Sequence, residues 1–201
     1  MDQFFRLRLL GDPVLREPAR TVRDFDEIEH FLPMMLKMMD AAEGVGLAAP
    51  QLGVSKRLLI MRVPTDNSEP LMGTDQVAQE TARTQILALV NPRLIWASDE
   101  EDTQIEHCLS IPGIAVPVTR PEKCRIEAEI ETGMTNIDLS RWTARIAQHE
   151  LDHLDGVLIL ERASPAARKK AYADLVNQHL DQHLLSPASP RQGRSLQGRL
   201  R

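Results

Sequence analysis

The segment Gln148-His149-Glu150-Leu151-Asp152-His153 (QHELDH) is the stretch around which the rest of this chain has to be organised. In a helix, His149 and His153 project from one face with Cβ atoms about 5–6 Å apart, close enough for two imidazoles to hold one metal ion. Glu150 lies about 100° further around the helix, where it can reach a water at the metal without being a ligand. The segment is typical of metal-assisted hydrolysis.

The residues before this segment extend the predicted helix from Ser140 to His153. Such a helix presents Trp142, Ile146 and Leu154 to a core, so the two imidazoles would be partly buried. Burial favours the neutral form of histidine, which is the form that binds a metal.

A second pair, His179 and His183, has the same four-residue spacing. No glutamate follows its first histidine, and it lies beside a basic tail. Spacing alone is therefore weak evidence for a metal site, and we interpret this second pair as part of an exposed helix face.

A catalytic metal commonly takes three protein ligands and keeps one position open, so a third ligand has to be found. No histidine follows His153 at a short distance, and Asp155 is too close to it in the helix. Cys108 is the better candidate, because a thiolate suits a borderline metal and the following Pro112-Gly113 marks a turn. From chemistry alone, Cys108 fits a buried core thiol equally well. A disulfide with Cys124 is a further alternative, disfavoured where nothing signals secretion.

The segment Gly44 to Gln51 (GVGLAAPQ) is the third candidate for a functional role. Its small residues allow another part of the chain to approach closely, and the amide of Gln51 can donate a hydrogen bond to an oxyanion. Taken alone, the segment fits a helix cap and a tight loop equally well. It is not a phosphate-binding loop, because no Gly-Lys-Ser/Thr follows.

Composition excludes several classes of function. The chain has 201 residues, a net charge of −5 and few aromatic residues (2 Trp, 1 Tyr and 4 Phe), which argues against general nucleic-acid binding. Its longest apolar runs fall far short of the roughly 18 residues that a membrane span needs. The N-terminus lacks a basic region followed by an apolar one, so we expect a cytoplasmic protein.

The end of the chain differs from the rest. Residues Ser186 to Arg201 carry four arginines and no acidic residue among Ser, Pro, Gln and Gly. This composition offers little to bury, so we expect a disordered basic tail. No repeat or internal linker precedes it, and we expect residues 1–185 to form one catalytic domain.

The pattern of apolar residues predicts an α+β fold. A helix is expected over residues 24–43, with Pro33 implying either a kink or a helix that starts there. A second is expected over 164–183, started by Ser164-Pro165. The runs that predict strands are Leu58 to Val63, Ile86 to Val90, Leu94 to Ala97, Ile114 to Val118 and Cys124 to Ile130. The polar stretch Thr65 to Thr84 is expected to be a surface excursion.

Three motifs together resemble the peptide deformylases: GVGLAAPQ at 44–51, EHCLS at 106–110 and QHELDH at 148–153. Residues 11–16 (GDPVLR) and 119–122 (TRPE) support the resemblance, which runs from about Leu7 to the final helix and omits the polar excursion and the tail. It implies short, mostly antiparallel sheets packed around a central helix that carries HELDH, with a C-terminal helix.

The resemblance also implies an activity: metal-dependent hydrolysis of the N-formyl group from the N-formyl-methionine that begins new polypeptides, with release of formate. Cys108, His149 and His153 would bind one divalent metal ion, Fe²⁺ natively in many members and replaceable by Zn²⁺, Ni²⁺ or Co²⁺. The ion would activate water while Glu150 moves the proton.

For the other site residues, the resemblance implies that Gln51 and the backbone N–H of Leu109 stabilise the oxyanion. The peptide would pair with the backbone near Val45 and Gly46, its methionine in an apolar pocket. Positions that match residues lining that pocket in the family are Gly44, Val45, Glu106, Ile146 and His149.

One position departs from the family pattern: His107 stands where a glycine is usual. In an extended segment His107 and Cys108 point to opposite sides, so His107 is expected to affect peptide selection rather than to bind the metal. This leaves two alternatives to a peptide deformylase: a related amidohydrolase with altered N-acyl peptide selectivity, and a non-catalytic metal-binding member of the fold. The C-terminal helix or tail offers a possible ribosome contact; no membrane and no specific nucleic-acid sequence is expected as a partner.

Overall fold

The computed structural model describes residues 6–65, 84–130 and 132–185. Its helices are η1 (Pro13–Arg16), α1 (Asp26–Glu29), α2 (Leu32–Ala41), η2 (Ala49–Leu52), α4 (Arg141–Leu154), α5 (Ile159–Arg162) and α6 (Pro165–Leu185). Its strands are β1 (Gly46–Ala48), β2 (Leu58–Pro64), β3 (Thr84–Ala97), β4 (Glu101–Cys108), β5 (Ile111–Pro121), β6 (Lys123–Ile130) and β7 (Gly133–Ser140).

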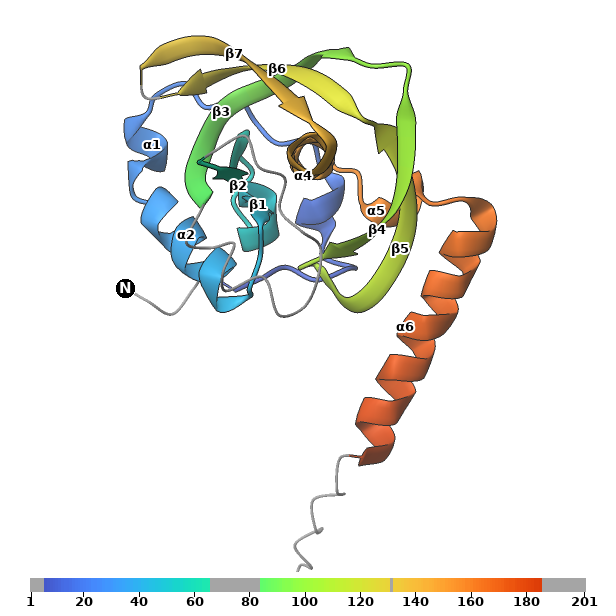
Figure 1. Cartoon of the computed structure of the whole chain (residues 1–201). Coiled ribbons are helices and arrows are strands. Elements are labelled where there is room, and N and C mark those ends of the chain that lie inside the picture. Colours follow the sequence, from blue (N-terminus) through green and yellow to red (C-terminus); the bar gives the residue numbers. More distant parts are fainter. Residues whose placement is uncertain (1–5, 66–83, 131, 186–201) are drawn as a thin grey trace, which may run out of the picture.

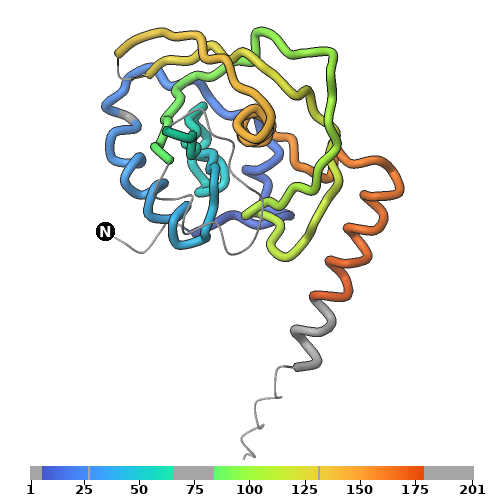
Figure 2. The backbone as a smooth tube through the Cα atoms, viewed as in Figure 1, coloured from blue at the N-terminus to red at the C-terminus, as the bar shows by residue number. Residues whose placement is uncertain are grey.

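The strands form two antiparallel sheets. A five-stranded sheet has the order β1-β2-β3-β6-β7, and β4 and β5 form a separate hairpin. Helix α4 lies at the centre of the molecule, between the larger sheet and the β4–β5 hairpin, while α6 extends away from this body (Figures 1 and 2). The α+β class predicted from the apolar pattern is confirmed, and so are the antiparallel sheets around a central helix that the family resemblance implies.

Helix α4 is central because nearly all of its second half is buried, by apolar side chains and by His149, Glu150 and His153. Ser140, extended in conformation, forms the N-cap, and the helix is buried from Ile146 to Leu154. Ala147, Leu151 and Leu154 pack against core residues of the larger sheet. Each buried aliphatic side chain contributes about 1.5–3 kcal/mol, so the position of α4 is strongly fixed.

The β4–β5 hairpin brings Cys108 to α4. Along β4, side chains alternate between exposed and buried, with Glu106 and Cys108 buried and His107 exposed between them. The register shifts between His107 and Cys108, where the strand ends in a turn. Strand alternation therefore directs Cys108 inward, as predicted, and leaves His107 on the other side.

The helix expected over residues 24–43 is two helices, α1 and α2. Pro33 lies in the first turn of α2, where it has no intrahelical N–H bond to lose, so the second of the two options for this proline is confirmed. The two runs at 86–90 and 94–97 belong to one strand, β3, with irregular pairing to β6 between them. Asn91 has a positive φ of 49° there.

Three strands were not predicted: β1, β4 and β7. Strand β1 has only three residues, and β4 and β7 carry many polar side chains, so neither length nor apolar pattern signals them. The helices expected at 140–153 and 164–183 are confirmed by α4 and α6. Among the helices of the described ranges, none combines the length and apolar character needed to cross a membrane.

Two other expectations fall outside the described residues. The polar excursion is described only at its ends, and the basic tail from residue 186 not at all. The side chains of His179 and His183 also lie outside the described part of the chain.

Candidate metal centre

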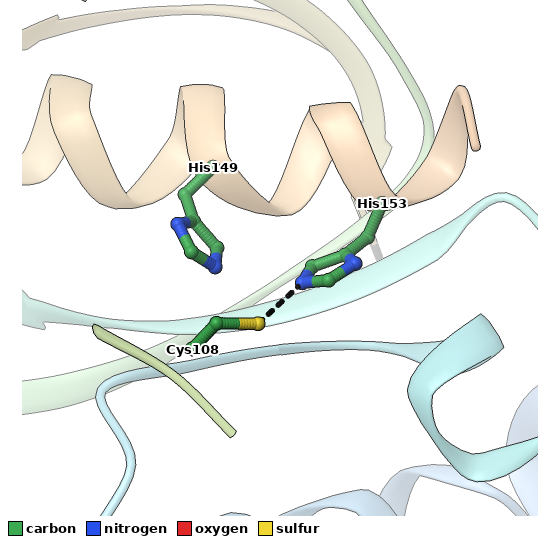
Figure 3. Close-up of side chains that lie close together, drawn as sticks. All are labelled: Cys108, His149 and His153. Atoms are coloured by element: carbon green, nitrogen blue, oxygen red, sulfur yellow. Dashed lines mark hydrogen bonds between the residues drawn. The ribbon is translucent and has the colours of Figure 1, made fainter. Parts of the chain in front are cut away.

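The three predicted ligands meet at one point. Cys108 from the end of β4 and His149 and His153 from α4 are all buried, and their ligand atoms all lie within 4.8 Å of one another. Cys108 Sγ is 3.2 Å from His153 Nε2. The thiol and both imidazole rings converge from two different elements (Figure 3).

These distances fit a metal ion. With metal–sulfur and metal–nitrogen bonds of about 2.3 and 2.0–2.1 Å, tetrahedral geometry places ligand atoms roughly 3.3–3.6 Å apart. Two imidazoles and a thiolate suit Zn²⁺, Fe²⁺, Co²⁺ or Ni²⁺ rather than Mg²⁺ or Ca²⁺. The donor set found here is therefore suited to a first-row divalent transition metal.

Glu106 orients His149. The Nδ1 of His149 donates to Glu106 Oε2 at 2.9 Å, which fixes the tautomer and leaves Nε2 with its lone pair for a metal. Burial alone lowers the pKa of His149, but its hydrogen bonds to Cys108 and Glu106 raise that pKa well above the ordinary value. The negative charge of Glu106, which stabilises a proton on His149, equally favours a cation bound in place of that proton.

Glu106 is itself held by two arginines. Arg120 donates to both carboxylate oxygens, at 2.6 and 3.0 Å, and Arg145 donates to Oε1 at 2.8 Å. Burial alone raises the pKa of Glu106, but the hydrogen bonds from His149 and Arg120 lower it to about 2. Glu106 is therefore a permanent negative charge behind His149.

Arg120 continues this network to the far side of α4. Its Nη1 donates to Asp152 Oδ2 at 2.9 Å, and Arg162 donates to the other oxygen of Asp152. The side chain of Arg120 is only 4% exposed. Buried charges of this kind are tolerated only when paired, and here every carboxylate has at least two donors.

His153 has a different environment. Burial lowers its pKa well below the ordinary value, and the charges of His149 and Arg120 lower it further. Its Nδ1 is buried without a hydrogen-bond partner in the described part of the chain. His153 is therefore neutral, with Nε2 facing Cys108.

Glu150 is a buried carboxyl group beside the ligands. It is 4% exposed, and its Oε2 has no hydrogen-bond partner among the residues that the structure describes. Burial raises the pKa of Glu150 to about 7, opposed by the charge of His149. Few buried carboxylate oxygens lack a partner, so the Oε2 of Glu150 is an unused acceptor beside the ligands.

Gln51 lies against the thiol. Its Oε1 accepts from the backbone N–H of Ala48 at 2.9 Å, which directs Nε2 toward Ser110 Oγ (3.3 Å) and Cys108 Sγ (3.9 Å). The side-chain amide of Gln51 is thus fixed in orientation, with its donor beside the ligand set.

A cavity of about 540 Å³ opens onto the centre. The predicted site residues that line it are Gly44, Val45, Gly46, Gln51, Glu106, His107, Cys108, Leu109, Ile146, His149 and Glu150. His153 is not part of the lining. Gly46 lies directly against α4, since a Cβ there would be 2.5 Å from Glu150 Oε1 and 2.8 Å from Ile146 Cγ2.

Sequence reasoning missed the residues that hold the ligands in place. Arg145 also lines the cavity. Arg120 holds Glu106, and Asp152 in turn holds Arg120. Ser110 accepts a hydrogen bond from the side-chain amide of Gln51. Asp152 lies inside the HELDH segment and Arg120 inside TRPE, so their positions were available, but nothing in their spacing indicated that they pair.

Both cysteines are free, so the disulfide alternative is wrong. Cys124 is a core residue of β6, where burial raises the pKa of its thiol to about 11, with Asp138 adding to the shift. Cys124 is thus an inert core thiol, whereas Cys108 belongs to the site.

Comparison with known proteins supports this assignment. A family model for polypeptide deformylases matches residues 5–169. The peptide deformylase of Thermus thermophilus is 38% identical over 172 residues, which cover 85% of this chain and 87% of that protein. That of Natranaerobius thermophilus is 36% identical over 167 residues, covering 82% of this chain and 96% of that protein.

Solved structures agree with the sequence matches. The crystal structure of a peptide deformylase from Thermus thermophilus has a TM-score of 0.71 and 36% identity, covering 88% of this chain and 98% of that one. A plant peptide deformylase has a TM-score of 0.76 and 30% identity, covering 94% and 97%.

Proposed function

The chain belongs to the peptide deformylase family of metal-dependent hydrolases, and we propose that Glu150 is the general base of its deformylation reaction. The substrate is a peptide that begins with N-formyl-methionine, and formate is released. The observation that carries this proposal is the buried, unpartnered Oε2 of Glu150 at the wall of the cavity that contains Cys108 and His149.

A divalent metal held by Cys108, His149 and His153 would supply Lewis-acid chemistry and lower the pKa of a water molecule. We propose Fe²⁺ as the native ion, on the basis of the family resemblance; the donor set is equally suited to Zn²⁺, Ni²⁺ and Co²⁺. Glu106 holds the Nδ1 proton of His149, so that the ring keeps its metal-facing lone pair.

The position of Glu150 suits two proton transfers. A carboxylate at this wall of the cavity takes the proton of the attacking water and later delivers it to the departing amine. Such transfers by a positioned side chain contribute about 10²–10⁴-fold in rate. Gly46 permits this position, because any side chain there would meet the carboxylate.

Two donors are proposed for the oxyanion. The Nε2 of Gln51 is fixed beside Cys108, and Leu109, whose backbone N–H is the second donor, lines the same cavity. A donor of this kind contributes about 3–4 kcal/mol to transition-state stabilisation.

The cavity has space for the methionine and the start of the peptide. Val45 and Ile146 supply apolar wall, and Gly44 and Gly46 leave the backbone of this segment accessible to a peptide strand. Glu106 lines the cavity, but both its oxygens are bonded to His149 and arginines, so we propose that it acts on the peptide only through His149.

The test is formate release from formyl-Met-Ala-Ser by the Fe²⁺ or Ni²⁺ form. A peptide deformylase releases formate at a rate that saturates with peptide. A related amidohydrolase would release little formate but would cleave another N-acyl peptide, and a non-catalytic member would do neither. The last result would contradict the role given to Glu150.

We further propose that the protein works in the cytoplasm, where new polypeptides emerge, and that its C-terminal helix or tail contacts the ribosome. The arginines of residues 186–201 support the second proposal, since RNA is a polyanion. Deleting these residues should reduce co-pelleting with ribosomes at low salt. Unchanged pelleting would contradict it.

A further inference from the structure

Glu43 occupies a position where the fold alone favours glycine. Helix α2 ends in a Schellman motif: the backbone N–H of Glu43 donates to the carbonyl of Asp40, and that of Gly44 donates to the carbonyl of Met39. The motif places Glu43 in the left-handed region, with a φ of 53°. Glycine is the usual residue there, because a side chain makes this backbone conformation unfavourable.

The charge of Glu43 is also unfavourable for the helix. The carbonyl end of a helix carries a partial negative charge, which repels a carboxylate. The carboxylate of Asp40, in the last turn of α2, is paired with Arg62. Glu43 is exposed, and within the described residues no hydrogen bond or ion pair of its side chain compensates for the repulsion. Neither the helix nor the core therefore explains a glutamate at this position.

The side chain of Glu43 belongs to the lining of the cavity at the metal centre. Three other residues with a carboxylate or guanidinium group line this cavity. Glu106 and Arg145 are paired with each other, and Glu150 is buried against Gly46. Among these four groups, the charge of Glu43 is thus the one that remains available to a molecule entering the cavity from solvent.

The distance of Glu43 from the reacting end indicates which part of a peptide it would meet. Gly46 lies against Glu150, so the formyl end of the substrate belongs at Gly46. Beyond Gly46, Leu47 is fully buried, so a peptide paired with this segment continues only toward Glu43. The three residue steps from Gly46 to Glu43 span at most about 10 Å, and an extended peptide covers this distance in about three residues. Glu43 is therefore nearest to the second or third residue of the peptide.

We propose that Glu43 determines part of the peptide specificity, favouring substrates with lysine or arginine as the second or third residue over substrates with an acidic residue there. This specificity rests on the proposed deformylation reaction. A cationic side chain of the peptide pairs with the carboxylate at the mouth of the cavity, whereas an anionic one is repelled. The contact is remote from the reacting atoms and equal in the ground and transition states, so it acts on KM rather than on kcat.

The test measures formate release by the metal-loaded full-length protein from three C-terminally amidated peptides. They begin with formyl-Met, and their second and third residues are both Lys, both Ser or both Glu. The test variant is Glu43→Gln, which keeps the size of the side chain and removes its charge. The matched control is Glu100→Gln, because Glu100 is likewise exposed but does not line the cavity.

At low salt, kcat/KM of the unmodified protein should be about two- to fivefold higher for the Lys peptide than for the Ser peptide, the size of effect expected of an exposed ion pair. The value for the Glu peptide should be lower than for the Ser peptide. Added salt should reduce both differences. Glu43→Gln should bring the three values together through KM, and Glu100→Gln should leave their ratios unchanged.

The variant Glu43→Gly provides a readout that does not depend on activity. Glycine should raise the urea midpoint, because it suits the left-handed position and removes a carboxylate from the helix end. A lower midpoint would show that glutamate serves the fold, and it would overturn the proposal. So would an unmodified protein that does not distinguish the three peptides, or a Glu43→Gln protein that retains the preference for Lys. If none of the three peptides released formate, the deformylation reaction itself would be contradicted, and the specificity would fall with it.

Discussion

Glu106 accepts a hydrogen bond from Nδ1 of His149 at 2.9 Å, so that one strand of the hairpin directly orients a ligand on the central helix. Arg120 and Arg145 fix Glu106 from the other side. The imidazole is therefore oriented by the protein as well as by the metal, and the consequence can be measured.

Replacing Glu106 by Gln should weaken metal binding by about 10–100-fold, because the loss of an outer partner of a ligating histidine has effects of this size. Competition with a chelator measures it. Glu101→Gln, on the exposed face of the same strand, is the control and should bind metal normally. Equal affinities in the two variants would show that Glu106 does not position His149.

The change Glu150→Ala should reduce kcat by about 10²–10⁴-fold while the protein keeps one metal per chain, because the base is lost and the ligands remain. Metal analysis and formate release on the same sample separate the two effects. Loss of the metal would instead assign Glu150 to the ligand set.

At Gly46, an added methyl group would lie 2.5 Å from Glu150 Oε1 and 2.8 Å from the stiff, β-branched side chain of Ile146. Gly46→Ala should therefore displace Glu150 and lower kcat by roughly tenfold or more. A general base that is out of position loses part of its contribution of about 10²–10⁴-fold to the rate. Gly44→Ala is the comparison, because its nearest contact is the flexible end of Leu109, at 2.9 Å. A Gly46→Ala enzyme as active as Gly44→Ala would show that α4 adjusts freely.

His107 is exposed and lines the cavity at the metal centre. His107→Gly should change kcat/KM for formyl-Met peptides by roughly tenfold, to an extent that depends on the residues after methionine, because a side chain is removed beside the peptide. Metal content should not change. If kcat/KM is the same for every peptide tested, His107 has no role in selection.

Acid stability should depend on Glu161. Burial alone raises its pKa, but hydrogen bonds from Arg16 and the backbone of Leu158 lower it below the ordinary value. A carboxyl group with a lowered pKa in the folded state stabilises the fold above its unfolded pKa of about 4.3, and this contribution disappears as the pH falls through the folded value.

Glu161→Gln should accordingly lower the urea midpoint at pH 7 and lower it less as the pH falls below the unfolded pKa. The effect is small, since the pair is partly exposed. Glu100→Gln, an exposed glutamate, controls for the loss of one negative charge. The same decrease at every pH in Glu161→Gln would rule out the titration of Glu161 as the cause.

The sequence predicted the ligands because their chemistry is local. His149, Glu150 and His153 lie within about one turn of helix. The chemistry of Cys108 left a ligand and a core thiol equally open, and the resemblance decided for the ligand. Helices α4 and α6 were predictable from apolar spacing and from Ser164-Pro165. Pro33 correctly left open a helix that begins at the proline.

What could not be predicted depends on long-range packing. The polar strand β4 is held by its pairing to β5 and by bonds from Glu106 to three partners, none of which gives it an apolar pattern. The pairing of Arg120 with Asp152 joins residues on β5 and α4 that only the folded hairpin brings together. Buried ion networks leave no periodic signal in a sequence.

Cys108 and His153 are separated by 45 positions along the chain and come within 3.2 Å only after the hairpin has closed onto the helix. Before the hairpin closes onto α4, the three ligands are therefore not held together around a cation. Metal affinity arises together with the folded arrangement, and a bound ion adds its binding free energy to the stability of the closed hairpin and helix.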